Sequence, residues 1–323
     1  MPAAPDRAAV GSPPATLELV VKNSLFLTSL EPEMTVIAAY DHGEIDNPDL
    51  LAFSRLSYLD RISSIIAVVH RLAPPGGAVA ELGCAQGNVS LLLAEAGYRV
   101  TAVDLNPVFL RYSQMRYERG RIDWRLANIE NSCLPPESQD FVILGEVVEH
   151  CAYPERIVEK AFQLLVPGGH LLITTPNYSF LGAPGLPSFR EILRRSSRSD
   201  LEARQFGPDG KDHLFLFTRR ELRLLCPAGG GVEASGYLSN AILGKLPKAL
   251  FVRLFTPASA SKAMRLLSLL PMVNRLTCAG QFIVIHKKSK LTHAVQSLPT
   301  TEAGQAEWLS GGLERWRIQL RTL

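Results

Sequence analysis

The chain has 323 residues, 46% of them hydrophobic, and a formal net charge of +3. This length allows one large domain or two small ones with a sizeable buried core. No apolar run approaches the ~18 residues that span a bilayer, which excludes a predicted transmembrane helix. The five cysteines are scattered and form no Cys-x-x-Cys pair, so the sequence favours a reducing compartment over a disulfide framework. We therefore expect a soluble cytoplasmic protein.

The first 15 residues are rich in proline and alanine and lack the order of charged and apolar residues found in signal peptides. We expect a disordered leader there, within an N-terminal extension that covers residues 1–49. Strand and helix patterns then alternate along the chain. Apolar spacing, glycine or proline stops and one Asn-Pro cap predict helices at 50–72, 88–97, 106–120, 153–169 and 218–230. Short apolar or alternating runs predict strands at 78–82, 98–104, 122–128, 140–146, 170–176, 231–238 and 281–288.

This alternation predicts an α/β fold: a doubly wound, mostly parallel seven-stranded sheet covered by helices, with a helical insertion before the last strand. We expect the domain to cover residues 50–288, with a mobile lid at 177–213 and a basic helical insertion at 241–276. The tail, 289–323, is expected to be a loosely attached linker with a short helix at 307–320. In such sheets ligands bind beyond the carboxyl ends of the strands.

A glycine-containing turn joins the first strand of this sheet to the next helix. The segment VAELGCAQGN at 79–88 contains Gly83 and Gly87, which let the backbone approach a ligand closely. It matches neither the GxGxxG pattern of dinucleotide binders nor a P-loop. Glu81 lies at the end of its strand, and the next strand ends in Asp104, whose carboxylate can accept both hydroxyls of a ribose.

The segment GEVVEHC at 145–151 places two carboxylates and an imidazole at the end of a buried strand. Ionised carboxylates are costly there unless something compensates their charge. Glu146, Glu149 and His150 are spaced i, i+3, i+4, so they share one face if a helical turn begins at Glu146. From the residues alone, a metal site, an acid/base site, a ligand pocket and an exposed helix start all remain open.

Taken together, the loop at 81–87, Asp104, EVVEH and LLVPGGHLLITTPN resemble the class I S-adenosylmethionine-dependent methyltransferases, most of all the ubiquinone-biosynthesis type of O-methyltransferase. The resemblance covers residues 75–177 well and 206–288 loosely. It implies a Rossmann-like methyltransferase fold with S-adenosylmethionine as cofactor. The cofactor-binding residues that it implies are Glu81, Gly83, Cys84, Ala85, Gly87, Asp104, Leu105, Asn128, Ile129 and Glu146.

The resemblance also assigns parts of the cofactor to these residues. Glu81 and the loop would face its amino-acid part, and Asp104 would bind its ribose. Two positions depart from the family pattern: Ala85 replaces the middle glycine, and Asn128 replaces an aspartate that contacts the adenine amine. We expect a modest effect of Ala85 if its backbone angles are allowed. The Asn128 carbonyl can still accept that hydrogen bond, and Ile129 would pack on the ring.

The resemblance further implies catalytic roles for Glu146, Glu149 and His150, and in some family members a divalent ion held by these residues. The small-RNA 3′-end 2′-O-methyltransferases share the Glu-x-x-Glu-His pattern, and His213 in KDHLFLFTRREL resembles their other histidine ligand. Carboxylate oxygens suit Mg²⁺ or Mn²⁺, and imidazole shifts the preference toward Mn²⁺ and similar ions. A metal-free pocket with His150 as general base stays open, because similar histidine segments occur in metal-free relatives.

The acceptor is left open by the sequence. From Ala234 to Thr301 there is no acidic residue but nine lysines and arginines, and many lie in the insertion at 241–276. This segment is interpreted as a helical cover, as a peripheral membrane contact or as a phosphate contact to RNA; the absence of an aromatic platform counts against RNA. The leading hypothesis is O-methylation of a small metabolite, isoprenoid-like ring or sugar hydroxyl. The alternatives are a metal-dependent RNA 2′-O-methyltransferase and a catalytically silent binding module.

Overall fold

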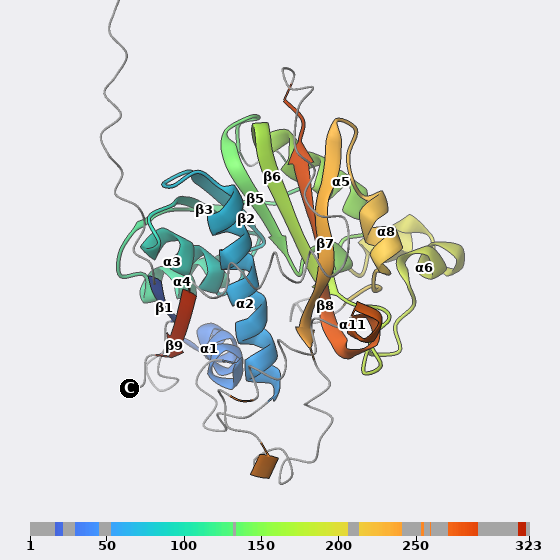
Figure 1. The fold of residues 1–323 in the computed structure, drawn as a ribbon, viewed down its shortest axis with the longest axis horizontal. Helices are drawn as coiled ribbons and strands as arrows, with labels where there is room; N and C mark the ends of the chain where they lie inside the picture. Colours follow the sequence, from blue (N-terminus) through green and yellow to red (C-terminus); the bar gives the residue numbers. More distant parts are fainter. Residues whose placement is uncertain are drawn as a thin grey trace, which may run out of the picture.

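A central seven-stranded sheet with helices on both faces dominates the structure (Figure 1). The computed structural model describes residues 17–21, 30–44, 53–131, 134–205, 213–240, 253–254, 259, 271–289 and 316–320. In the order in which they lie side by side, the strands are β4 (Arg121–Leu126), β3 (Arg99–Asp104), β2 (Ala78–Leu82), β5 (Gln139–Gly145), β6 (Leu165–Pro176), β8 (Cys278–Lys287) and β7 (Gly230–Asn240). Neighbouring strands are parallel except β8, which runs antiparallel to both β6 and β7. The predicted fold class is confirmed.

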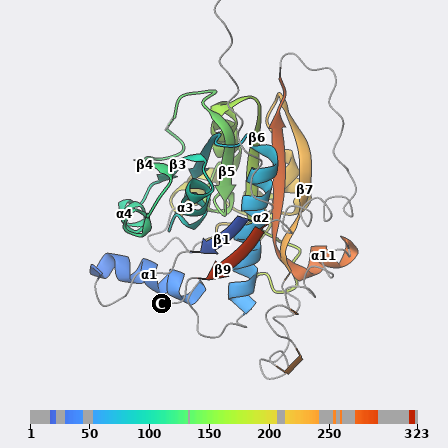
Figure 2. The same cartoon turned by 60° about the vertical axis from the view of Figure 1, so that its left-hand side comes forward.

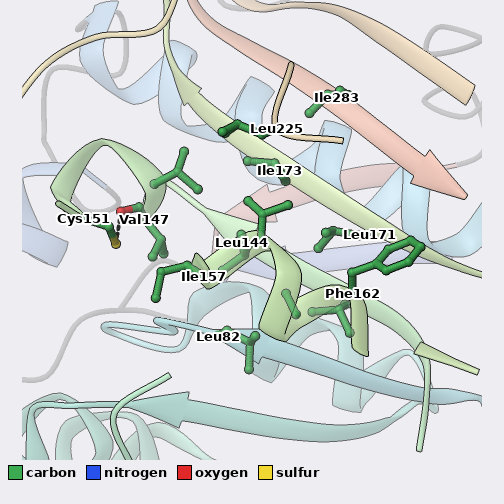
Figure 3. Close-up of a cluster of buried hydrophobic side chains, with 14 of the residues drawn as sticks. Leu82, Leu144, Val147, Cys151, Ile157, Phe162, Leu171, Ile173, Leu225 and Ile283 are labelled. Carbon is green, nitrogen blue, oxygen red and sulfur yellow. Dashed lines mark hydrogen bonds between the residues drawn. The ribbon is translucent and has the colours of Figure 1, made fainter. Parts of the chain in front are cut away.

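The two faces of the sheet are covered by different helices. On one face, α2 (Phe53–Leu72) and α3 (Asn88–Glu95) pack their apolar side chains against Phe141 and Ile143 of β5. On the other, α5 (Pro154–Leu164) and α8 (Arg219–Leu224) pack against Val142 and Leu144 of the same strand. Successive side chains of a strand point to opposite faces, so one buried apolar run supplies both cores. Figure 3 shows the second core, where Ile157 and Phe162 surround Leu144.

The helix that follows β3 begins as the sequence predicts. Asn106 caps α4 (Pro107–Arg116) by accepting a hydrogen bond from the Val108 N–H, with proline in the first turn. A further helix, α1 (Pro32–Glu44), lies in the expected N-terminal extension and was not predicted as a helix. Its Ile37 and Ala38 pack against Tyr112 of α4, and Figure 2 shows α1 beneath α4 at one end of the molecule. The apolar contact between two helices, rather than the weak amphipathic pattern of α1, explains its position.

The segment predicted as a mobile lid contains two short helices. In the described residues 177–205, α6 (Phe189–Arg195) and α7 (Arg198–Glu202) each begin with a capping box. Ser188 pairs with Glu191, and Ser197 pairs with Asp200. These two helices were not predicted from the sequence; their Ser-x-x-acidic patterns satisfy the first backbone N–H groups of each helix. Residues 206–212 of the predicted lid lie outside the described residues.

The insertion and the tail are described only in part. The insertion ends in α11 (Pro271–Thr277), which leads into β8, whereas most of 241–270 lies outside the described residues. In the tail, β9 (Trp316–Leu320) pairs in parallel with β1 (Leu17–Val21). The helix predicted at 307–320 is therefore wrong over its described part, because backbone pairing with a distant strand outweighs local helical spacing. None of the described helices is long and apolar enough to cross a membrane.

Candidate functional site

A cavity of about 350 Å³ lies where the central strands end at their carboxyl termini. Its walls come from α2, the glycine loop after β2, the ends of β5 and β6, and the segment before α8. The lining residues are Tyr58, Arg61, Ile62, Ile65, Glu81, Gly83, Cys84, Ala85, Gln86, Asn88, Val89, Gly145, Glu146, Thr174, His150 and His213. The sequence motifs around residues 81–87 and 145–150 thus meet in one cavity, as expected for strand ends in an open α/β sheet.

The glycine loop turns sharply between β2 and α3 in a left-handed backbone conformation. Gly83, Ala85 and Gly87 have φ angles of +79°, +44° and +73°. A Cβ at Gly87 would lie 2.0 Å from Ser113 Oγ, so this position requires glycine for space as well as for conformation. Ala85 occupies a conformation that costs an L-residue about 1–2 kcal/mol. The sequence predicts a modest effect of Ala85 if its backbone angles are allowed. The backbone does adopt this conformation at Ala85, but at the cost of strain.

Glu81 is a buried carboxyl group in the wall of the cavity. The Ser90 hydroxyl of α3 donates a 2.5 Å hydrogen bond to Glu81 Oε2. Burial raises the pKa of Glu81 to about 7, and the hydrogen bond from Ser90 opposes this rise. Such a group accepts hydrogen bonds when ionised and donates one when protonated, so it can face the amino-acid part of a cofactor in either state.

Asp104 lies at the end of β3, beside the glycine loop rather than in the cavity lining. Its Oδ2 accepts a hydrogen bond from the Ala85 N–H and its Oδ1 accepts one from the Asn106 N–H, both at 2.8 Å. Burial raises the pKa of Asp104, and these backbone donors oppose the rise. Each carboxylate oxygen keeps a second lone pair, so binding a ribose through Asp104 stays a prediction. Leu105, the next residue, is 47% exposed.

Asn128 and Ile129, the two residues expected near the adenine, have different surroundings in the structure. Asn128 Oδ1 accepts a hydrogen bond from the Glu130 N–H at 2.9 Å and forms a tight local turn. Ile129 packs against the core beneath α5 and lines a separate small cavity with Leu82 and Leu134. The structure therefore does not bring Ile129 into the main cavity, and its expected stacking on the adenine ring would require the ring to reach this neighbouring cavity.

Glu146 lies outside the helical turn that contains Glu149 and His150. It has a φ of +57°, and the helical turn that follows, η2, covers only Val148–His150. The condition for a shared face, a helical turn that begins at Glu146, is not met, because this left-handed residue redirects the chain before the turn. Glu146 instead lies 3.2 Å from Arg61 of α2 and accepts a 2.9 Å hydrogen bond from the Thr174 hydroxyl. Non-glycine residues in this conformation are strained, and such strain often marks functional positions.

Glu149 is completely buried in η2. Its Oε2 accepts a 3.0 Å hydrogen bond from Thr175, while its Oε1 has no hydrogen-bond partner among the described residues. Burial raises the pKa of Glu149 well above its usual range, and the charge of Glu146 adds to this effect. A buried carboxylate with one unsatisfied oxygen is costly unless a cation or a hydrogen-bond donor approaches it.

Two histidines lie beside this unsatisfied oxygen. Leu214 donates its backbone N–H to the Glu149 carbonyl at 3.0 Å, which docks the segment containing His213 against η2. His213 Nε2 lies 3.9 Å from Glu149 Oε1, and the rings of His150 and His213 are 4.8 Å apart. One donor atom from each of these three residues lies within 4.8 Å of the others. The donor set fits a divalent ion, since small side-chain rotations would bring an oxygen and two imidazole nitrogens to one point.

Several residues of the cavity were not singled out in the sequence. Thr174 and Thr175 end β6 and hydrogen-bond Glu146 and Glu149, respectively. Their position at the carboxyl end of a predicted strand, directly before Pro176, could have indicated a role in ligand binding. Ligands bind beyond the carboxyl ends of the strands in such sheets. Tyr58 and Arg61 come from α2, where their i, i+3 spacing alone did not distinguish a cavity wall from a solvated face.

Comparison with known proteins identifies the central part of the chain. A family model described as "Methyltransferase domain" matches residues 80–173, which include the glycine loop, Asp104 and the EVVEH segment. The chain therefore contains a class I S-adenosylmethionine-dependent methyltransferase domain. The ubiquinone biosynthesis O-methyltransferase of Xanthomonas campestris pv. campestris is 34% identical to this chain over 113 residues, which are 34% of this chain and 47% of that protein.

Further relatives of the methyltransferase domain have the same degree of similarity. The ubiquinone biosynthesis O-methyltransferase of Xylella fastidiosa is 34% identical over 113 residues, covering 34% of this chain and 46% of that protein. The chain thus spans about half the length of the curated relatives it matches. An S-adenosylmethionine-dependent methyltransferase structure from Methanosarcina mazei is 16% identical, covers 69% of this chain and 98% of that chain, and has a TM-score of 0.44.

Proposed function

We propose that the protein transfers a methyl group from S-adenosylmethionine to an oxygen of a small acceptor, such as a small metabolite, an isoprenoid-like ring or a sugar hydroxyl. The observation that carries the proposal is that one cavity joins the glycine loop of a methyltransferase domain to His150 and His213, with the buried carboxyl group of Glu149 beside both histidines. The likeness to ubiquinone biosynthesis O-methyltransferases supports oxygen as the methylated atom.

The residues on one side of the cavity would bind the cofactor, and those on the other side would bind the acceptor. S-adenosylmethionine supplies an electrophilic methyl group on a sulfonium centre. On one side, the glycine loop, Glu81 and Asp104 would bind and orient it. On the other, Ile62 and Ile65 of α2 exclude water, and in the metal-free alternative His150 would take the proton of the acceptor hydroxyl. Glu146 would orient the acceptor rather than stabilise the transition state, because a carboxylate close to the sulfonium favours its charged ground state.

In the second alternative, the acceptor hydroxyl is activated by a divalent ion in place of a free His150. Glu149, His150 and His213 would hold it, and when bound it would lower the pKa of a coordinated acceptor hydroxyl. The unsatisfied Oε1 of Glu149 is the observation of this structure that fits such an ion. Glu146 does not belong to this donor cluster in the described part of the chain, so its expected role as a metal ligand has less support than that of the other three.

The cofactor side is tested by calorimetry with S-adenosylhomocysteine. We expect Asp104→Ala to weaken binding tenfold or more, on the scale of a lost charged hydrogen bond of ~1.5–3 kcal/mol. Unchanged affinity would remove Asp104 from the cofactor site. No binding of S-adenosylmethionine at millimolar concentration by the native protein would favour the alternative of a catalytically silent binding module.

The acceptor side is tested by methyl transfer across pools of phenols, sugars and small RNAs, each with and without a chelator. Transfer to a small hydroxyl compound supports the proposal. The approach of His213 to Glu149 and His150 also suits an RNA 2′-O-methyltransferase, which stands as the second candidate. That candidate requires salt-dependent RNA binding and transfer to a 3′-terminal ribose; absence of both removes it.

We further propose that residues 241–276 contact the membrane surface peripherally. This contact would set the location of the protein and not its chemistry. The basic, apolar composition of the segment supports it, although most of these residues lie outside the described ones. Sedimentation with anionic vesicles tests it: binding that weakens at high salt supports a charged contact, and recovery of all protein in the supernatant contradicts it.

A further inference from the structure

A completely buried ion pair joins α1 to α4. Asp41 Oδ2 lies 2.6 Å from Arg116 Nη1, and the two side chains are 0% and 1% exposed. Burying two charges costs several kcal/mol for each ion, and apolar side chains of similar volume often hold two helices equally well or better. Apolar contacts between α1 and α4 already exist through Ile37, Ala38 and Tyr112. The ion pair therefore calls for a reason other than holding the two helices together.

Both members of the pair also contact the glycine loop. Arg116 Nη1 donates a 3.2 Å hydrogen bond to the Gln86 carbonyl. Asn88 Nδ2 donates a 2.9 Å hydrogen bond to Asp41 Oδ1. Gln86 and Asn88 are the residues on either side of Gly87, whose φ of +73° forms the last bend of the loop. The ion pair thus anchors the loop from both sides of this bend.

The same contacts fix the wall of the cavity. Asn88 lines the cavity and also donates a 2.5 Å hydrogen bond to the Tyr58 hydroxyl of α2. Because an ionised Asp41 only accepts hydrogen bonds, the amide of Asn88 must present its NH₂ group to Asp41. Asp41 therefore sets the orientation of a cavity side chain without lying in the cavity lining itself.

We propose that Asp41 and Arg116 are positioning residues for the cofactor loop, so that α1 completes the cofactor site from outside the segment that matches the methyltransferase family. This inference rests on the proposed function. The strained φ of Ala85 and the chain entropy lost at Gly83 and Gly87 make the loop costly to form, and the ion pair keeps it in the binding conformation before the cofactor arrives. Loss of the pair would raise the KM for S-adenosylmethionine and leave kcat nearly unchanged, because cofactor binding would have to reorder the loop.

The deciding variant is Asp41→Leu combined with Arg116→Met, which replaces both charges by apolar side chains. We expect a thermal midpoint equal to or above that of the native protein, together with at least tenfold weaker S-adenosylhomocysteine binding by calorimetry. In activity assays, KM for S-adenosylmethionine should rise at least tenfold while kcat changes less than about threefold. Hydrogen exchange without cofactor should become faster at the amides of residues 83–88.

The matched control is Glu33→Gln. Glu33 and Arg111 form an exposed ion pair of 3.4 Å between the same two helices, without contact to the loop. We expect native cofactor affinity and native hydrogen exchange in this variant. If the double variant does not fold, Asp41→Asn combined with Arg116→Gln carries the same comparison, because it also removes both charges and leaves no unpaired buried ion.

Native affinity and native loop exchange in the double variant overturn the inference, as does an equal loss of affinity in Glu33→Gln. The proposed function fails in a different way: the native protein then binds no cofactor at all. In that case the hydrogen exchange of residues 83–88 still decides whether Asp41 and Arg116 order the loop.

Discussion

Asp104 and Glu149 are both buried carboxyl groups next to the cavity, yet their surroundings differ. The two oxygens of Asp104 accept hydrogen bonds from the backbone N–H groups of Ala85, in the glycine loop, and of Asn106. Glu149 has one oxygen bound by Thr175, whereas the other lacks a hydrogen-bond partner in the described part of the chain and faces His213. The backbone thus holds both oxygens of Asp104 in place and leaves one lone pair on each for a ligand, whereas Oε1 of Glu149 is open to a cation or a hydroxyl group.

The largest effect is expected from Glu149→Gln, which tests this difference directly. The change keeps the volume but removes the charge that would hold a divalent ion, so turnover should fall about a thousandfold. Mn²⁺ should raise the thermal midpoint of the native protein but not that of the variant. Stability without metal should not fall, because a desolvated carboxylate is removed. If the Glu149→Gln variant turns over as fast as the native protein and a chelator still inhibits it, Glu149 does not hold the metal.

A smaller effect is expected from Glu81→Gln on the pH dependence of stability. Burial raises the pKa of Glu81 to about 7 from 4.5, so the folded state binds the proton more tightly than the unfolded chain. This favours folding below pH 4.5, and the advantage is lost as the pH rises to 7. At 1.36 kcal/mol per pKa unit, the free energy of unfolding falls by about 3 kcal/mol.

Urea unfolding between pH 4.5 and 7.5 measures this loss. The Glu81→Gln variant should show a flatter profile than the native protein. Ser90→Ala is the informative partner, since it removes the hydrogen bond that favours the ionised form and should extend the decline above pH 7. Identical profiles for Glu81→Gln and the native protein would show that Glu81 titrates normally.

Next in size is the effect of Arg61→Met on the acceptor side. Arg61 pairs with Glu146, and its positive charge partly opposes the rise that burial causes in the pKa of Glu149. Removing this cation leaves the two carboxylates without its compensation and should tighten Mn²⁺ binding about tenfold. Titration calorimetry with Mn²⁺ measures the change, and Arg61→Lys, which retains the charge, is the control. Weaker Mn²⁺ binding in Arg61→Met would place the ion elsewhere.

The smallest effect is expected from Ala85→Gly on the cofactor side. At a φ of +44°, glycine avoids a cost of about 1–2 kcal/mol but gives up about 0.5–1 kcal/mol of chain entropy. Denaturant unfolding should therefore show a gain of up to about 1.5 kcal/mol. Ala96→Gly is the matched control, because Ala96 has a φ of −73° and gains nothing from glycine. A loss of stability in Ala85→Gly would show that the loop relaxes in solution.

Local sequence patterns were sufficient for most of the sheet and for the cofactor loop. Strand β5 is a continuous apolar run because both of its faces are covered, and α4 begins where Asn106 and Pro107 predict. The sequence predicts a turn at Gly87. It does not predict the positive φ of Ala85, because alanine rarely adopts this conformation. The capping boxes at Ser188 and Ser197 were readable signals that the lid prediction missed.

The sequence by itself determined the order of strands and helices, the glycine loop and the placement of polar residues at strand ends, because these follow from side-chain periodicity and backbone preferences over a few residues. Only the tertiary structure decided that His213 joins Glu149 and His150, that Glu146 turns to Arg61, and that Asp41 reaches Arg116. These contacts join residues that are far apart along the chain or redirect the backbone at one residue. Their geometry depends on the packing of helices against the sheet, which no local pattern encodes.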